Sequence, residues 1–151
     1  MVTLEYLRTG QYVDRGREHQ EGVDLARVSR ADLRWYYFLS ELSFTVDGAQ
    51  LAPPWSWTPV FDFLWSMHGV LGYLERGVGS TLGFTENAEL IKFTPEAGKI
   101  RIACTYSTIE AVCELAELRN AWIALRHDVL AELSLEYPQL AENQALAELG
   151  L

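Results

Sequence analysis

Cysteine is scarce in this chain of 151 residues, which holds only Cys104 and Cys113. Two cysteines are too few for the disulfide framework that stabilises many small secreted domains. The first 19 residues are mixed and charged, and they contain neither the apolar core nor the cleavage site of a secretory signal. Proline, glycine or charge interrupts each apolar run well before it reaches the length of a membrane span. We therefore expect a cytoplasmic protein with two free thiols and no membrane partner.

Basic residues are also few, since 12 Lys and Arg stand against 21 Asp and Glu and give a formal net charge of −9. Only Lys92 and Lys99 are lysines, a bias toward arginine that is typical of GC-rich bacterial genomes. A negative chain is poorly suited to binding nucleic acid through phosphates or to binding anionic lipid. It is suited to a basic partner, which the negative field attracts.

The sequence contains no phosphate-binding loop, dinucleotide fingerprint, zinc-protease motif or nucleophile elbow. His19, His68 and His127 are far apart and have no partner at ligand spacing. The fold could bring His68 and His127 to Cys104 and Cys113, as metal ligands or as a Cys–His nucleophilic pair. Because ligand-like spacing is missing, helix histidines and core thiols are the better interpretation. We expect no metal, no cofactor and no enzyme activity.

Hydrophobic residues make up 49% of the chain and charged residues 22%, which predicts one packed domain over residues 1–151, with residues 1–28 as a peripheral or partly flexible N-terminal segment. Two long helices are predicted from apolar residues at steps of three and four. The first begins with Thr58 as N-cap and Pro59 as first helical residue, and it ends at Leu74. The second covers 115–136. A shorter helix over 29–39 opens with Ser29 and Asp32 in capping-box positions.

Strands are predicted from alternating apolar and polar residues. They cover 42–47, 81–84, 89–93 and 99–106, whereas 2–8 and 107–113 fit either strand or helix. The last three predicted strands follow one another through short turns and form an antiparallel meander with one wet face. The sequence therefore predicts an α+β two-layer sandwich, with an antiparallel sheet of about four strands and the two long amphipathic helices packed on one face.

Two groups of residues in the middle of the chain have both a structural and a functional interpretation. Trp55 and Trp57, in a proline-bounded loop, are either a plug of the core or a platform for a ligand or partner. Asp62 and Glu86 are either a helix-start carboxylate and a turn residue, or a pair of carboxylates for acid–base chemistry. The structural interpretation is the commoner one for both groups.

The net charge is concentrated in the last third of the chain. Residues 1–34 hold equal numbers of acidic and basic residues, whereas residues 102–151 hold eight acidic and two basic ones. Four of these acids, Glu110, Glu114, Glu117 and Glu132, lie on or just before the predicted last helix. They are either a solvated face or the binding surface for a partner.

Three motifs stand out along the chain: Trp-x-Trp-x-Pro-Val-x-Asp-Phe at 55–63, Phe-Thr-Glu at 84–86 and Pro-x-Leu-x-x-Asn at 138–143. Together they resemble a family of uncharacterised proteins from GC-rich bacteria that is defined only as a domain of unknown function. The resemblance covers roughly residues 31–145 and departs from the pattern at 107–110. It implies no activity, ligand or catalytic residue.

A small acidic α+β domain without a catalytic motif is also similar in type to the immunity proteins of bacterial toxin systems, which bind and block one toxin domain. Our leading hypothesis is a non-enzymatic immunity protein that neutralises a basic toxin domain, such as a nuclease, by direct association. Its expected contacts are Glu86, Glu110, Glu114, Glu117, Glu132, Trp55 and Trp57.

Two alternatives remain open. One is a small enzyme or ligand-binding module with a pocket between Trp55, Trp57, Asp62 and the sheet. The other is a homodimeric scaffold joined through a wet sheet face around Thr45 and Thr105. The expected oligomeric state is therefore either monomer or homodimer.

Overall fold

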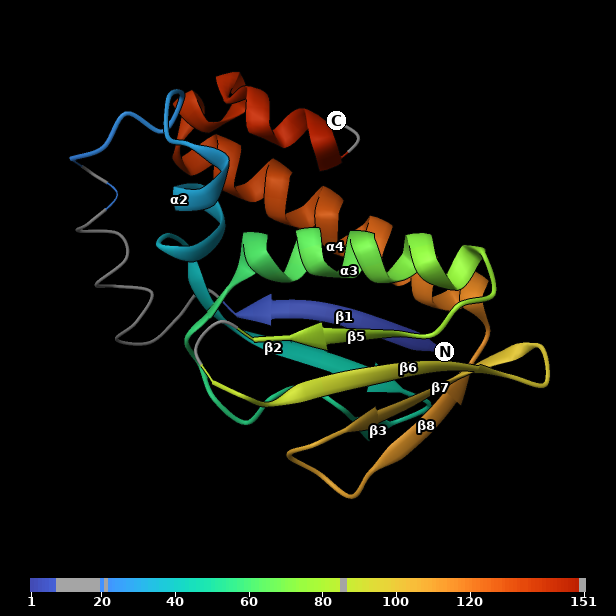
Figure 1. Ribbon diagram of the computed structural model, residues 1–151. Helices are drawn as coiled ribbons and strands as arrows, with labels where there is room; N and C mark the ends of the chain where they lie inside the picture. The colour runs from blue at the N-terminus through green and yellow to red at the C-terminus, as the bar shows by residue number, and fades with distance from the viewer. Residues whose placement is uncertain (8–19, 21, 85–86, 150–151) are drawn as a thin grey trace.

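The chain has an α+β fold in which helices cover two antiparallel sheets (Figure 1). The computed structural model describes residues 1–7, 20, 22–84 and 87–149. The first sheet consists of β1 (Val2–Leu7), β2 (Leu39–Val46), β3 (Ala49–Gln50) and β4 (Thr58–Pro59). The second consists of β5 (Ser80–Gly83), β6 (Leu90–Glu96), β7 (Lys99–Cys104) and β8 (Glu110–Cys113). The described helices are α2 (Arg30–Trp35), α3 (Val60–Glu75), α4 (Leu115–Glu136) and the 3-10 helices η1 (Pro138–Glu142) and η2 (Gln144–Leu149).

The first sheet is built around β2, whose central residues Leu42, Phe44 and Val46 are buried as their alternation predicts. The β1 strand pairs with β2 over its whole length, which decides the open choice at 2–8 in favour of a strand. Val2 and Leu4 are buried, so the expectation of a peripheral segment at 1–28 does not hold for β1. The burial of two apolar side chains makes this strand part of the core.

The second sheet is the predicted meander, extended by one strand. Its order is β5-β6-β7-β8, and β8 pairs with β7, so residues 110–113 are a strand rather than the start of a helix. The turn between β6 and β7 lies at Ala97 and Gly98, both at positive φ, and Pro95 therefore falls inside β6. Proline is tolerated there because the pairing of β6 with β5 ends at Phe93, so no residue of β5 needs a backbone N–H from Pro95.

The strands divide between two sheets of four, where the sequence predicts one sheet of about four strands. The proline-rich stretch after β3 cannot extend the hydrogen-bond ladder of the first sheet. The helix α3 then separates the first sheet from β5, which is the first strand of the second sheet. The inner faces of the two sheets meet beneath the helices, where Phe44 of β2 stacks on Phe93 of β6 with ring centroids 6.5 Å apart.

The helix starts differ in part from their predicted caps. Ser29 caps α2 as expected, since its hydroxyl accepts the Asp32 N–H at 3.1 Å, but the helix ends at Trp35 and β2 begins at Leu39. The prediction of Thr58 as N-cap of the next helix is wrong. Thr58 belongs to β4, pairs with β2 and accepts a hydrogen bond from Trp55, so Pro59 is the N-cap and α3 starts one residue later than predicted.

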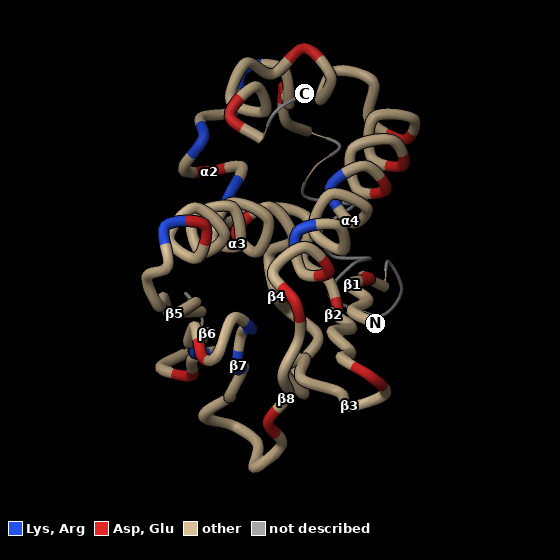
Figure 2. Tube along the Cα trace, turned by 90° about the vertical axis from the view of Figure 1, so that its right-hand side faces the viewer, with Lys and Arg blue, Asp and Glu red and all other residues tan. Residues whose placement is uncertain are grey.

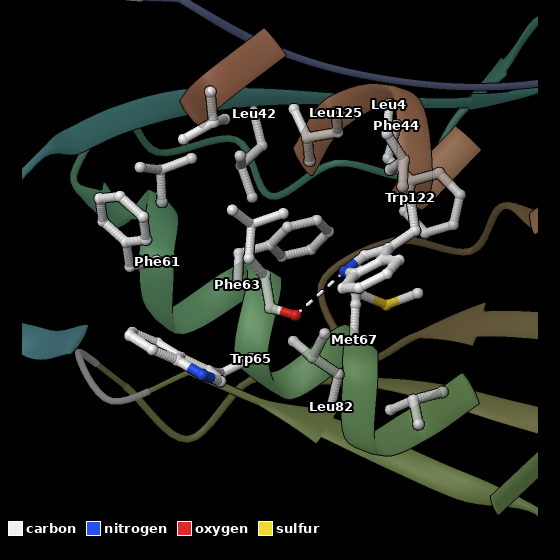
Figure 3. Close-up of a cluster of buried hydrophobic side chains, with 14 of the residues drawn as sticks. Leu4, Leu42, Phe44, Phe61, Phe63, Trp65, Met67, Leu82, Trp122 and Leu125 are labelled. Atoms are coloured by element: carbon white, nitrogen blue, oxygen red, sulfur yellow. Dashed lines mark hydrogen bonds between the residues drawn. The ribbon is translucent and has the colours of Figure 1, made fainter. Parts of the chain in front are cut away.

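The two long helices are joined through the core that they share with both sheets. In Figure 3 the indole of Trp122, from α4, points at α3, where its Nε1 donates to the Leu64 carbonyl at 3.0 Å. Apolar side chains of both sheets and both helices surround this bond, Phe44, Phe63, Met67 and Leu125 among them. Because α4 packs on β1 and α3 on β5 and β6, each helix covers one of the sheets.

Candidate functional site

Three of the four candidate glutamates lie along β8 and the start of α4: Glu110 is the first residue of β8, Glu114 follows its last residue, and Glu117 is in the first turn of α4. Glu114 and Glu117 form a reciprocal capping box, in which each carboxylate accepts a backbone N–H of the other residue. Glu132 lies eighteen positions after Glu114, about 27 Å along the helix at 1.5 Å per residue, and accepts the Tyr6 hydroxyl at 2.8 Å. The structure therefore separates Glu132 from Glu110, Glu114 and Glu117, and the four do not form one patch.

The carboxylates around β8 are partly neutralised by neighbouring cations on the outer face of the second sheet. Arg101 donates to Glu96 at 2.5 Å and to Glu110 at 3.1 Å, while Lys99 lies 3.6 Å from Glu114. The hydrogen bond from Arg101 holds the pKa of the Glu96 carboxyl below its usual range. All these side chains are exposed, and exposed ion pairs contribute little to stability, so a partner can replace them at small cost.

Exposed apolar side chains also occur on this sheet, and no pattern in the sequence marks them as exposed. Ile109 is 42% exposed and Val112 is 44% exposed, and Val112 sits opposite Arg101 in the ladder. Leu90, 39% exposed, lies apart from them at the start of β6, beside Thr105 and opposite Gly83 of β5. We name the β8 surface as Ile109 and Val112 with the rim Glu96, Lys99, Arg101, Glu110 and Glu114. A red segment marks its acidic part on β8 in Figure 2.

The two tryptophans of the proline-bounded loop have different environments. Trp55 is buried, donates to Thr58 Oγ1 at 3.0 Å, and packs edge-on against Phe84 and Tyr106. Trp57 is 38% exposed and stacks on Trp55 with ring centroids 6.2 Å apart. Trp55 is thus part of the core, while Trp57 presents a ring to solvent next to the aromatic cluster.

Asp62 has a structural environment. It is 4% exposed and accepts hydrogen bonds from Arg34 Nε at 2.5 Å and Trp35 Nε1 at 3.2 Å. Glu86 lies outside the described residues, so its pairing with Asp62 stays untested. Asp62 is bonded to Arg34 and Trp35 of α2, whereas Trp55 packs on Phe84, so the contacts of the two residues involve different elements.

Thr45 and Thr105, which were expected on one solvent-exposed sheet face, lie on two different sheets. Thr45 belongs to β2 of the first sheet, and Thr105 follows β7 of the second. Thr45 directly follows Phe44, and Thr105 directly follows Cys104, and the side chains of Phe44 and Cys104 point inward. Because successive side chains of a strand point to opposite faces, Thr45 and Thr105 point outward. Because the two sheets face each other through their inner sides, Thr45 and Thr105 are on outer faces of different sheets.

The thiols and histidines stay apart. Both cysteines are free, and Cys104 and Tyr106 donate to the same carbonyl, that of Leu51, at 3.4 Å and 2.6 Å. Burial raises the pKa of both cysteine thiols, that of Cys113 to about 11, which disfavours the nucleophilic thiolate. His68 stacks on Trp122, and no three His, Cys, Asp or Glu side chains of the described residues gather at a metal-binding distance.

A groove of about 450 Å³ runs between α2, the outer side of α3 and β5. It is lined by Arg30, Arg34, Trp65, Ser66, His68, Gly69, Val70, Tyr73, Ser80, Thr81, Leu82, Gly83 and Glu148. Arg30 pairs with Glu148 at 2.8 Å, and Arg34 donates to Ser66 Oγ at 3.0 Å. Basic segments flank α2 in Figure 2. By contrast, the cavity between Tyr6, Phe38 and Tyr137 holds only about 20 Å³, the space of a water molecule.

Comparisons with protein-family models, with curated proteins and with solved structures gave no match to this chain. Within the described part of the chain, no helix combines the length and apolar character required to span a bilayer.

Proposed function

We propose that the protein is a non-enzymatic binding protein that acts by stoichiometric association, as an immunity protein does with its toxin, and that the β8 surface is its contact surface. The observation that carries the proposal is the exposure of Ile109 and Val112, 42% and 44%, next to Glu110 on β8 and to Arg101 on the outer face of the second sheet. An apolar centre with a charged rim is the usual composition of a protein–protein interface.

The charges of this surface favour a basic partner. Glu96, Glu110 and Glu114 are each about half exposed, and their present cations are surface residues of the same sheet. A cation of the partner can take the place of Lys99 or Arg101 without leaving a buried charge unpaired. Trp57 extends the available apolar area, because it stacks on Trp55 next to Tyr106 at the β7–β8 turn.

The edge of the sheet adds a second mode of contact. β8 is the last strand of its sheet and pairs on one side only, with β7. Edge strands are templates for pairing with another chain. The raised pKa of the buried Cys113 thiol disfavours its use as a nucleophile, and the edge strand supports a binding role.

The test is co-expression with the toxin-like proteins encoded beside this gene, scored by growth and by co-elution in size-exclusion chromatography. We expect one such protein to be neutralised in a one-to-one complex. Val112→Lys should weaken the complex at least tenfold, because it places a charge in the apolar centre. The matched control is Leu135→Lys at the far end of α4, where the leucine is already 84% exposed.

Three results would contradict the proposal. Toxicity that persists in the presence of the protein with every adjacent product excludes an immunity role. Equal loss of binding in the Val112 and Leu135 variants places the contact elsewhere. A turnover of substrate that survives in the absence of any partner protein would favour an enzyme.

A further inference from the structure

The outer edge of β5 carries backbone groups that no strand of the described chain pairs with. Leu90 of β6 accepts the Thr105 N–H at 3.0 Å and donates to Thr105 Oγ1 at 2.8 Å, so its backbone groups point away from β5. Backbone groups alternate along an antiparallel ladder, so Ile91 and Phe93 point toward β5. Their partners Leu82 and Ser80 are then the bonded residues of β5. Thr81 and Gly83 therefore direct both N–H and C=O to the free edge.

This free edge borders the groove described above. Ser80, Thr81, Leu82 and Gly83 all line the groove, although consecutive side chains of a strand point to opposite faces. Four consecutive residues can border one hollow when the backbone edge of the strand, rather than one face, forms its wall. The groove thus has a strand edge on one side and Arg30 and Arg34 on the other.

The groove contains a buried hydrogen-bond donor, the indole N–H of Trp65, that has no acceptor. Trp65 is 5% exposed and lines the groove, and its Nε1 is the one buried side-chain nitrogen or oxygen of the described residues without a hydrogen-bond partner. In Figure 3 its ring projects from α3 away from Leu42 and Leu125, so it is directed out of the central core. A buried indole N–H without an acceptor is unfavourable, and a ligand that brings an acceptor removes this cost.

The charged groups of the groove favour an acidic ligand. Two guanidinium groups line it: Arg34 is paired with the buried Asp62 and keeps that partner, whereas Arg30 is paired with Glu148 at the surface. The Arg30 guanidinium lies 5.7 Å from the centre of the Trp65 ring, and its ion pair with Glu148 is half exposed and thus exchangeable. Ser66 and the outward N–H groups of Thr81 and Gly83 add further donors.

We propose that this groove binds an extended acidic segment of a partner protein as an additional strand on β5. The peptide backbone pairs with Thr81 and Gly83, and an aspartate or glutamate side chain reaches Arg30 and the Trp65 indole. Strand addition of this kind takes its affinity from main-chain hydrogen bonds and its specificity from the side-chain pockets beside the strand. The site lies on α2, α3 and β5, apart from the β8 surface, and does not depend on the immunity role.

The experiment is an array of eight-residue peptides in which β-branched residues alternate with glutamate, read out by fluorescence and then by NMR on the tightest binder. Matched arrays carry glutamine or lysine in place of glutamate. We expect the glutamate peptides to bind at least tenfold more tightly than the glutamine ones. The amide signals of Thr81 and Gly83 and the indole signal of Trp65, assigned with Trp65→Phe, should shift together.

Matched variants separate the parts of the site. Arg30→Gln should reduce binding about tenfold, whereas Arg27→Gln, at an exposed arginine outside the groove, should not. Thr81→Pro removes the outward N–H and should abolish binding, and Thr81→Val keeps the N–H and should retain it. If the proline variant is unfolded, N-methylation of alternate residues of the peptide tests the same hydrogen bonds on the unaltered protein.

Four outcomes would overturn the proposal. They are no binding across the arrays, no preference for glutamate, and the same NMR shifts with inorganic phosphate alone at equal ionic strength, which would make the groove a small-anion site. The fourth is a concentration-dependent dimer with shifts at Thr81 and Gly83, which would show that a second copy of the chain occupies the edge.

Discussion

Replacing Arg34 by methionine is expected to lower the free energy of unfolding by about 3 kcal/mol, because it leaves the Asp62 carboxylate buried without its cation. Asp62 is 4% exposed, and Arg34 Nε lies 2.5 Å from its Oδ1. Removing one partner of a buried ion pair typically costs about 3–5 kcal/mol. The lower end applies here, since the Arg34 side chain is 22% exposed and Trp35 still donates to the carboxylate.

The partner variant Asp62→Asn should cost less, about 1–2 kcal/mol, because Arg34 can turn toward solvent once the carboxylate is neutral. The double variant should then cost about 1–2 kcal/mol less than the two single variants together, which is the coupling of residues in direct contact. Arg34 also donates to Ser66 of α3. The cycle therefore measures how strongly this contact holds α2 against α3.

The measurement is urea unfolding followed by far-ultraviolet circular dichroism and tryptophan fluorescence, with thermal unfolding alongside. A loss of about 3 kcal/mol corresponds to a fall in Tm of roughly 6–12 °C for a domain of this size. The matched control is Arg27→Met, whose ion pair with Asp24 is exposed, and it should change stability by less than about 0.5 kcal/mol.

The reasoning is refuted if Arg34→Met costs less than about 1 kcal/mol, or if the two single effects add within error. Asp62→Asn also separates a structural from a catalytic role. A structural carboxylate lowers stability when it is neutralised, whereas a catalytic one would abolish turnover in a protein of unchanged Tm.

Three further changes test other parts of the structure. Asn143→Ala should lower stability by about 2 kcal/mol in urea unfolding, because the buried amide donates to the Leu25 and Val28 carbonyls at 2.8 Å and 3.0 Å; an effect below about 0.5 kcal/mol would contradict this anchoring. Burial raises the pKa of Cys113 from 9.0 to about 11, so the unfolded chain loses this proton first as pH rises. The stability that the neutral thiol provides is complete below pH 9 and should be lost between pH 9 and 11, by up to about 3 kcal/mol. Cys113→Ala should flatten this decline, and an unchanged pH profile would refute it. Ser29→Ala removes the cap of α2 and should cost about 1 kcal/mol in thermal unfolding, whereas Ser29→Asp should be nearly neutral.

The α+β class and the two long helices were predictable because their signals are periodic and local. Apolar residues at steps of three and four define α3 and α4, and alternation defines the centre of β2. The structure confirms these elements and the antiparallel meander. In each case the pattern extends over enough residues to distinguish a helical period from a strand period.

The remaining errors occur where a long-range contact overrides a local preference. Thr58 followed by Pro59 is a good helix start, yet Thr58 pairs with Ser40 of β2 and accepts from Trp55. The division into two sheets depends on β1, which finds its partner β2 more than thirty residues further along the chain. No local pattern carries that information, because the same alternation fits one sheet or two.

The acidic residues of the candidate site could be predicted from the sequence, but the exposed apolar residues beside them could not. Glu110 and Glu114 were identified from the concentration of charge, and they lie at the two ends of β8, but the structure gives Glu114 and Glu117 a capping role as well. Val112 was missed because 107–113 fitted both helix and strand, and the strand at β8 puts its side chain on the same outer face as that of Glu110. Ile109 precedes the strand, and no pattern in the sequence marks its exposure. The side chains that are exposed there follow from the pairing of β8 with β7.

The strand edges connect the two proposed surfaces. A sheet closed on neither side has two edges, and in the second sheet these are β5 and β8. Both are short, at four residues each, and short edge strands limit uncontrolled association. Carboxylates flank β8, whereas arginines stand across the groove from β5. Segments of opposite charge are therefore favoured at the two edges. A net charge of −9 alone would point only to basic partners, but the distribution of charge around this sheet also provides for an acidic one.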